Sequence, residues 1–172
     1  VEKVSAGSNG LLFFPSSGGY GHGKRGAFIG LSISHSRGEM ARSIMEGIAY
    51  DLRWTLEDVH EAGIKSEVLR MVGGAASSPT WTQIVTDVTQ IPVVVPSVTQ
   101  SASFGAGILA GFGCGVFSDL KEAYKALSGT EKLIKPDADN GDKYNRLFEI
   151  YRDAFQQVGD SLSRLSEFGS NI

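Results

Sequence analysis

The chain has 172 residues, of which 41% are hydrophobic and 20% are charged, and its formal net charge is −3. This length and composition are typical of one soluble globular domain with its own core, and they exclude a disordered chain. The lack of a basic excess argues against nucleic acid or an acidic membrane as a partner. No apolar run approaches the roughly 20 residues that cross a bilayer, so we expect no membrane segment.

The first third of the chain predicts two short strands and a long helix. Residues 11–14 are typical of a buried strand, and 27–33 form a second strand-like run. Ser36 and Glu39 have the spacing of a capping box, so we expect a helix to begin there and to end at Gly63. Apolar side chains that recur every three or four positions predict its buried face, which would consist of Met40, Ile44, Ile48, Leu52, Leu56 and Val59.

The middle of the chain alternates strands and helices. We predict a strand over 68–72, a helix over 79–90 and a strand over 92–96, which its bounding prolines place at or near a sheet edge. A further helix over 101–111 is rich in glycine and alanine. Small residues lower helix propensity, and their usual benefit is close backbone approach to a neighbouring element.

The last part of the chain predicts two helices separated by a loop. Asp119 and Glu122 open a short helix that ends at Leu127, and residues 130–140 read as a polar loop. The final helix is predicted over about 142–165, with an apolar face of Tyr144, Leu147, Phe148, Tyr151, Phe155, Val158, Leu162 and Leu165. Because strands alternate with helices, the fold class is α/β.

The single cysteine, Cys114, excludes an internal disulfide and fits a reducing compartment. Its neighbours are Gly113 and Gly115 in an apolar stretch, which predicts a small buried side chain rather than a reactive thiol. The histidines lack metal-ligand spacing, so no metal site is predicted. Glu46 lies off the apolar stripe of its helix and is predicted to be a solvated or hydrogen-bonded carboxylate.

The most informative stretch joins a strand to a helix through a glycine pair. The apolar run 68–72 stops at Gly73 and Gly74, and Ser78 is placed to cap the next helix, with Pro79 at its first position. Strand, glycine turn and helix N-terminus form a geometry that holds nucleotides. Glycines let a ligand approach the backbone, and the N–H groups at the helix start face it.

A glycine-rich loop over 15–25 comes near two phosphate-binding motifs without fulfilling either. Residues 18–25 almost spell G-x-x-x-x-G-K, but Arg25 stands where a Ser or Thr would bind magnesium. Residues 26–29 look extended, so the helix N-terminus that this motif and G-x-G-x-x-G both need is missing. We interpret the segment as a surface loop, with a lid or a partner-binding loop as its candidate roles.

Two segments resemble the FGGY family of carbohydrate kinases, in particular its xylulose-kinase-like members. Residues 26–31 and, after a spacer, 39–46 follow the second signature of that family at every restricted position. The stretch 73–81 is similar to the adenosine motif of the family. The resemblance covers the chain from about residue 10 to residue 165.

The resemblance implies an actin-like ATPase (ribonuclease H-like) fold, with residues 1–172 as one nucleotide-binding unit, the C-terminal part of the second domain. An N-terminal sugar-binding domain with an aspartate general base would then lie outside this chain, which agrees with the thin predicted sheet and with a first residue other than methionine. The intact cytoplasmic enzyme would transfer the γ-phosphate of ATP, with Mg²⁺, to a hydroxyl of xylulose or of a related pentulose or polyol. A homodimer would fit the family.

On the same basis Gly73, Gly74 and Ala75 would pack against the adenosine, and Ser77 and Ser78 would lie near the base. The chain holds no nucleophile, base and orienting group together, so we predict no catalytic residue in it and no activity for it alone. Two alternatives stay open. One is a free-standing, non-catalytic actin-like module that binds nucleotide or a partner. The other is an unrelated α/β domain with a chance match.

One departure from the family concerns the loop that follows the predicted first strand. Many xylulose-kinase-like members carry a Gly-Glu-Arg triplet there, whereas this chain reads Ser-Ser-Gly-Gly-Tyr over residues 16–20. The departure leaves the sugar open between xylulose and related substrates, and it also puts the usual loop contacts in the cleft in doubt. It affects the kinase class little.

Overall fold

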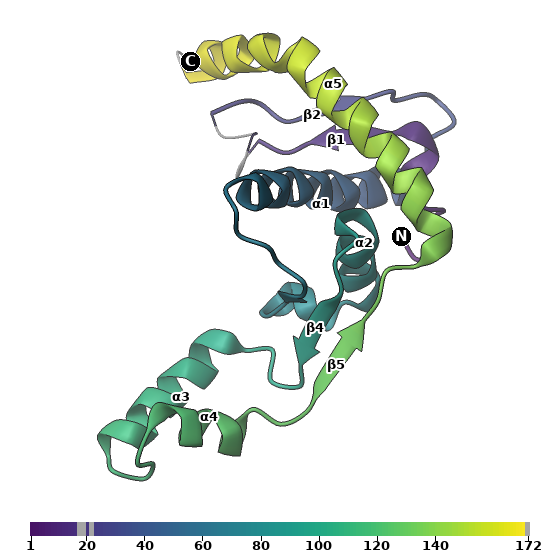
Figure 1. Ribbon diagram of the computed structural model, residues 1–172. Coiled ribbons are helices and arrows are strands. Elements are labelled where there is room, and N and C mark those ends of the chain that lie inside the picture. The colour runs from purple at the N-terminus through teal and green to yellow at the C-terminus, as the bar shows by residue number, and fades with distance from the viewer. Residues whose placement is uncertain (17–19, 21–22, 171–172) are drawn as a thin grey trace.

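The computed structural model describes residues 1–16, 20 and 23–170, in which two separate small sheets pack against helices (Figure 1). No helix in these ranges is long and apolar enough to cross a membrane. The elements follow one another as η1 (Ser8–Gly10), β1 (Leu12–Phe14), β2 (Ala27–Ile29), α1 (Arg37–Glu61), β3 (Leu69–Arg70), η3 (Gly74–Ser77), α2 (Pro79–Thr89), β4 (Val93–Pro96), α3 (Ser101–Gly113), α4 (Leu120–Leu127), β5 (Glu131–Ile134) and α5 (Ala138–Ser170).

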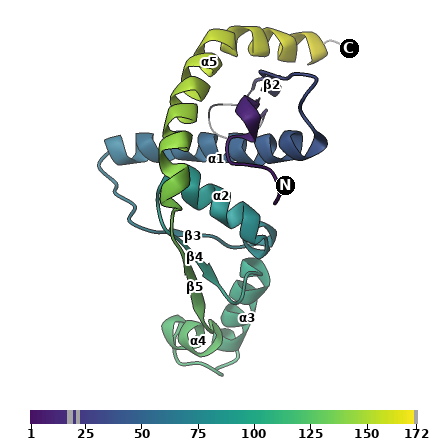
Figure 2. The ribbon, with the colours of Figure 1, turned by 90° about the vertical axis from the view of Figure 1, so that its right-hand side faces the viewer.

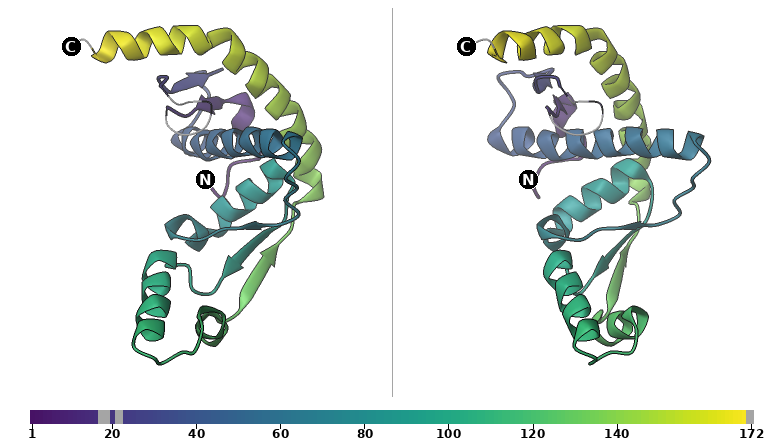
Figure 3. Two further views of the ribbon diagram at one scale, coloured as in Figure 1. Left: turned by 60° about the vertical axis from the view of Figure 1, so that its left-hand side comes forward. Right: turned by 90° about the vertical axis from the view of Figure 1, so that its left-hand side faces the viewer.

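Strands β1 and β2 form an antiparallel ladder in which Leu12 pairs with Ile29 and Phe14 pairs with Ala27. Both predicted strands are therefore present, although β2 ends at Ile29, because Gly30 has φ of 82° and leaves the extended conformation. The ladder lies between α1 and the C-terminal half of α5 (Figures 1 and 3). A two-stranded ladder is only marginally stable by itself, so this one depends on the two helices that cover it.

Helix α1 begins at the predicted capping box, because Ser36 and Glu39 each accept a hydrogen bond from the backbone of the other. Its predicted buried face is wrong. Ile44 is 37% exposed, Ile48 43% and Leu52 37%. The helix buries another face, which consists of Arg42, Ser43, Glu46, Gly47, Ala49, Tyr50, Asp51 and Trp54. The reason is that α1 packs closely on β1 through Gly47, where an added Cβ would overlap the Phe13 carbonyl oxygen.

Strands β3, β4 and β5 form the second sheet, with β4 in the middle, parallel to β3 and antiparallel to β5. The predicted edge position of β4 is therefore wrong. Its prolines stand at the ends and leave Val94 free to pair with both Arg70 and Leu133. The predicted loop over 130–140 is also wrong in part, since β5 lies within it. This edge strand is mostly exposed, and its charged residues suit an edge.

Helices α2 and α5 join the two sheets into one body. Asp87 of α2 is 2% exposed and accepts hydrogen bonds from the backbone N–H of Asp137 at 2.8 Å and from the side chain of Asn140 at 2.9 Å. It thereby fixes the start of α5. That helix extends beyond the predicted 142–165 at both ends, and its predicted apolar face is buried or half-buried except for Leu165, which is 55% exposed.

Helices α3 and α4 stand at the far end of the second sheet (Figure 2). No residue of α3 is buried within the part of the chain that the structure covers. The predicted close approach to a neighbouring element is absent at Gly105 and Gly107, which face open space. At Gly111 an added Cβ would lie 2.9 Å from the Phe117 ring, in the segment directly after the helix. Cys114 follows this helix and is exposed, so its predicted burial is wrong.

Candidate functional site

The predicted glycine turn lies directly after β3. Gly73 has φ of 81°, a conformation that favours glycine, and η3 follows at Gly74. A Cβ added to Gly73 or to Gly74 would meet no atom within 4 Å. The backbone of this turn therefore faces open space and is accessible to a ligand.

The residues after the glycines lead into α2 as the sequence predicts. The hydroxyl of Ser78 accepts a hydrogen bond from the backbone N–H of Trp81 at 3.2 Å, and Pro79 opens the helix. Gly74, Ala75 and Ser77 are exposed, while Gly73 and Ser78 are half-buried. The structure thus brings the five predicted site residues together on one turn. Because Ser78 caps α2, Ser77 is the hydroxyl that is more accessible there.

A neighbour that the sequence analysis missed is Thr99, in the loop between β4 and α3. Its carbonyl oxygen accepts hydrogen bonds from the backbone N–H of Gly73 at 2.6 Å and of Ser101 at 2.9 Å. Because β3 and β4 are parallel, their carboxyl ends meet at one edge of the sheet, which is the usual place of a ligand site in open α/β sheets. The sequence predicted both strands but not their parallel pairing, so Thr99 was not found as a neighbour.

An apolar cavity lies beside the turn. It has a volume of about 170 Å³, and its lining includes Val72, Val98, Phe104 and Tyr124. The rings of Phe104 and Tyr124 meet edge to face, with centroids 5.9 Å apart. Sites that enclose a small molecule usually have roughly 300 Å³ or more, so this cavity is too small to enclose a nucleotide. The turn would therefore form only one exposed side of a nucleotide site.

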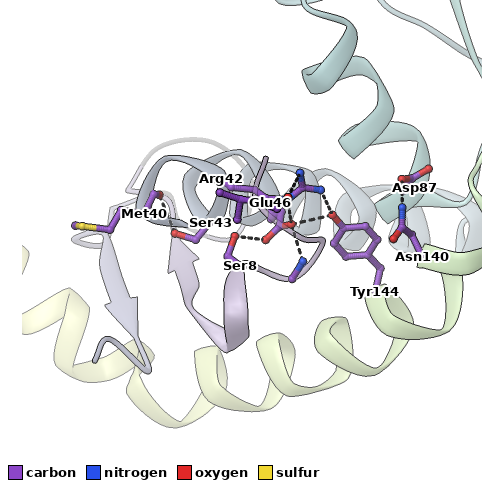
Figure 4. Close-up of polar contacts among 10 residues, drawn as sticks. Ser8, Met40, Arg42, Ser43, Glu46, Asp87, Asn140 and Tyr144 are labelled. Carbon is purple, nitrogen blue, oxygen red and sulfur yellow. Dashed lines mark hydrogen bonds and ion pairs between the residues drawn. The ribbon is translucent and has the colours of Figure 1, made fainter. Parts of the chain in front are cut away.

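A second polar cluster surrounds Glu46, which is 2% exposed (Figure 4). Its carboxylate accepts hydrogen bonds from the backbone N–H of Gly7 at 2.8 Å and from the Ser8 hydroxyl at 2.7 Å. The Arg42 Nε and the Tyr144 hydroxyl each donate to it at 2.8 Å. Glu46 is therefore the predicted hydrogen-bonded carboxylate, and the solvated alternative is wrong.

The Glu46 cluster joins three segments that are far apart in the chain. Arg42 also donates to the carbonyl oxygen of Val4 and to the Tyr144 hydroxyl, each at 3.0 Å. Burial raises the pKa of Tyr144, so its hydroxyl stays protonated and keeps donating to Glu46. The cluster has no open face, because Arg42 is 8% and Tyr144 0% exposed. We interpret it as a structural clasp between the N-terminal segment, α1 and α5.

The structure describes only part of the glycine-rich loop that nearly matched a phosphate motif. Residues 17–19, 21 and 22, and with them most of the motif, lie outside the described residues. Of the residues that are described, Tyr20 contacts α1 and Arg25 contacts α5. Among the described ranges no group of three His, Cys, Asp or Glu side chains could hold a metal ion.

Comparison with known proteins identifies the family. Residues 11–114 match the model of the FGGY family of carbohydrate kinases, C-terminal domain. A xylulose kinase of Bacillus subtilis is 32% identical over 99% of this chain and 35% of its own length. A gluconokinase of the same species is 29% identical over 98% of this chain and 34% of its own length. The chain thus spans about a third of the length of these relatives.

Solved structures lead to the same family. Gluconate kinase from Lactobacillus acidophilus matches 95% of this chain and 34% of its own, with a TM-score of 0.77 and 27% identity. Xylulose kinase from Rhodospirillum rubrum matches 94% of this chain and 33% of its own, with a TM-score of 0.74 and 25% identity. The expected α/β, actin-like ATPase fold is confirmed. On this sequence match and this likeness of fold, the chain belongs to the FGGY family of carbohydrate kinases.

Proposed function

We propose that this chain is the nucleotide-binding portion of a kinase that phosphorylates a hydroxyl of xylulose or of a related pentulose or polyol. The main observation behind this proposal is the turn at Gly73 and Gly74, which is open to a ligand. The turn lies at the carboxyl ends of two parallel strands, in a chain that belongs to this family. Relatives named xylulose kinase and gluconokinase support the substrate class. Such an enzyme works by positioning its reactants and by stabilising charge on the transferred phosphoryl group.

ATP would be held at the turn through backbone contact. Gly73, Gly74 and Ala75 would lie against the adenosine, since no Cβ of either glycine blocks the approach. Ser77 and Ser78 would lie near the base. ATP supplies the phosphoryl group when it is bound with Mg²⁺. The described residues offer no cluster of metal ligands, so we assign the ion to the ATP phosphates and to parts of the kinase beyond this chain.

The rest of the kinase would provide the sugar site and the general base, with residues 1–172 as one unit of the enzyme. Two exposed apolar surfaces support a role as part of a longer protein. One is the stripe of Ile44, Ile48 and Leu52 on α1, and the other includes Leu109 and Phe112 on α3, which are 62% and 45% exposed. Large exposed apolar patches mark interaction surfaces, and here the remainder of the kinase would cover them.

The test is ATP affinity and turnover of the whole enzyme with Gly74→Val. The added side chain would occupy the open space in which we place adenosine, so we expect the Kd for ATP to rise about tenfold or more, with the KM for the sugar unchanged. The control is Ala62→Val, which adds the same branched side chain at an exposed position after α1. Equal ATP affinity of Gly74→Val and the parent protein would exclude the turn as the adenosine contact.

A panel of pentuloses, polyols and gluconate, each with ATP and Mg²⁺, tests the kinase assignment separately. Turnover of one member is expected for the whole enzyme and no turnover for residues 1–172 alone. ATP binding without turnover of any sugar would favour the non-catalytic module instead. Turnover by residues 1–172 alone would contradict the assignment of the sugar site and the base to another part of the protein.

A further inference from the structure

The described residues of the loop between β1 and β2 have no role in the proposed site, yet they contact two helices. We propose that Tyr20, Lys24 and Arg25 form a strap that holds the C-terminal half of α5 against α1, a conformational device separate from nucleotide binding. The connection runs from Phe14 to Ala27, far longer than the roughly 2–5 residues of an ordinary hairpin loop. A long loop that is anchored at two points has a structural or functional reason.

One end of the strap is Tyr20, which lies on α1. Its ring stacks on Trp54 with centroids 3.8 Å apart and an interplanar angle of 23°. Its backbone N–H donates to Asp51 at 3.0 Å, and its hydroxyl donates to Asp58. Positions 51, 54 and 58 recur at helical spacing and share one face of α1. Burial and the hydrogen bond to Asp58 raise the pKa of Tyr20 to about 12, so this donor is retained at neutral pH.

The other end of the strap lies on α5. The Lys24 ammonium is 5.7 Å from the centroid of the Phe155 ring, and the Arg25 backbone N–H donates to the Leu162 carbonyl oxygen at 3.2 Å. A glycine of α5 leaves room for Arg25, because a Cβ at Gly169 would overlap the Arg25 guanidinium. At Gly159 an added Cβ would make only ordinary contact with Lys24 Cε, at 3.6 Å.

Arg25 also supplies a positive charge that the last turn of α5 lacks. The carbonyl groups at the C-terminus of a helix carry partial negative charge and favour a nearby cation. The last turn of α5 has no basic residue, and the guanidinium of Arg25 reaches it at Gly169. The loop therefore complements the end of this helix both in shape and in charge.

Trp54 connects the strap to both helices. Its indole contacts the Phe155 ring edge to face with centroids 5.8 Å apart, and the Arg152 guanidinium lies 5.0 Å from its ring. The ladder of β1 and β2 lies in the space between α1 and this half of α5 (Figure 3). Loss of the Tyr20 contacts would expose one face of the Trp54 indole. It would thereby weaken the packing of α5 over the β1–β2 ladder.

The experiment combines hydrogen–deuterium exchange with native trypsin cleavage of the whole protein carrying Tyr20→Ala. We expect amide exchange in residues 159–169 and cleavage after Lys24 and Arg25 to accelerate about tenfold, the factor for loss of an aromatic stack and a hydrogen bond. Exchange in α2 should stay unchanged. The control is Tyr124→Ala, which removes an exposed tyrosine of α4, and it should leave residues 159–169 at the parent rate.

Two further variants distinguish a local effect of the strap contacts from a general loss of stability. Tyr20→Phe keeps the stack on Trp54 and loses the hydroxyl, so its acceleration should be smaller than that of Tyr20→Ala. Arg25→Ala should speed exchange near residue 169 and leave α2 as in the parent protein. Unchanged rates in Tyr20→Ala, or an equal acceleration in α2 and in α5, would overturn the proposal. Neither outcome depends on ATP binding, so the test is independent of the proposed function.

Discussion

Gly47 in α1 and Gly74 before α2 have opposite surroundings. A Cβ at Gly47 would overlap a backbone oxygen of β1, whereas a Cβ at Gly74 would meet nothing within 4 Å. The first glycine belongs to a closed part of the molecule (β1, β2, α1 and α5), and the second to an open part (β3, β4, β5, η3, α3 and α4). The same residue type thus serves close packing in one part and an accessible backbone in the other.

Polar groups differ between the two parts in the same way. In the closed part, the buried carboxylate of Glu46 accepts hydrogen bonds from four partners. In the open part, Arg70 and Glu131 form an exposed ion pair at 2.7 Å, and α3 buries no residue. In the proposed function the open part receives a ligand or another domain, and its exposed groups would make their contacts there. The closed part therefore supplies rigidity, and the open part supplies the faces on which the proposed function depends.

The largest expected effect is the loss of the Glu46 cluster. Glu46→Ala would leave the Arg42 guanidinium buried without its carboxylate, and breaking a buried ion pair in this way costs about 3–5 kcal/mol. We expect a decrease of this size in the free energy of unfolding, measured by urea titration and circular dichroism. The control is Glu149→Ala, an exposed glutamate of α5, which should change little. Similar losses for both variants would contradict the distinction between a clasp and a surface charge.

The next effect compares glycines of the two parts directly. Gly47→Ala forces a methyl group against the backbone of β1 and should reduce the free energy of unfolding by about 1–3 kcal/mol, the usual cost of overpacking. Gly107→Ala in α3 meets open space and should raise it by about 0.5–1 kcal/mol through helix propensity. Thermal or urea unfolding measures both. A loss at Gly107 in the proposed longer kinase would instead show that another part of that protein covers α3.

Features that depend on neighbouring residues were predicted well from the sequence. Features that depend on contacts between distant segments were not. The capping box at Ser36 and the helix start at Ser78 and Pro79 lie where they were predicted, because each depends on neighbours within one turn. The strand β5 was missed, since an exposed edge strand with charged residues lacks an apolar pattern. The predicted buried face of α1 was wrong because both contacts that decide it are distant in sequence: the packing of Gly47 on β1 and the hydrogen bond from Tyr144 to Glu46.

The candidate site shows the same division. The turn at Gly73 and its cap were predicted from adjacent residues and are confirmed as structure, while the adenosine contact stays a prediction. Thr99, which holds the turn against α3, could not be found from spacing, since its contact with Gly73 depends on the parallel pairing of β3 and β4. Tyr20 gave no local signal either, because its partners on α1 follow it by about thirty residues or more.

The smallest effect concerns the buried carboxyl of Asp51 in the closed part, which is 9% exposed and accepts the Tyr20 backbone N–H. Burial raises its pKa in the folded protein. An acid whose folded pKa lies above the unfolded value makes the protein less stable as pH rises through that window. Asp51→Asn keeps an acceptor oxygen and removes the charge, so it should stabilise the protein at neutral pH.

The gain from Asp51→Asn should disappear as pH falls below the ordinary aspartate pKa of about 3.9, where both forms are uncharged. Urea midpoints at neutral and acidic pH measure the difference. Asp160→Asn, an exposed aspartate of α5, serves as the control and should show no such pH-dependent gain. A variant that is less stable than the parent at neutral pH would mean that the ionised carboxylate contributes more through Tyr20 than its burial costs. The strap would then depend on this charge as well as on the stack over Trp54.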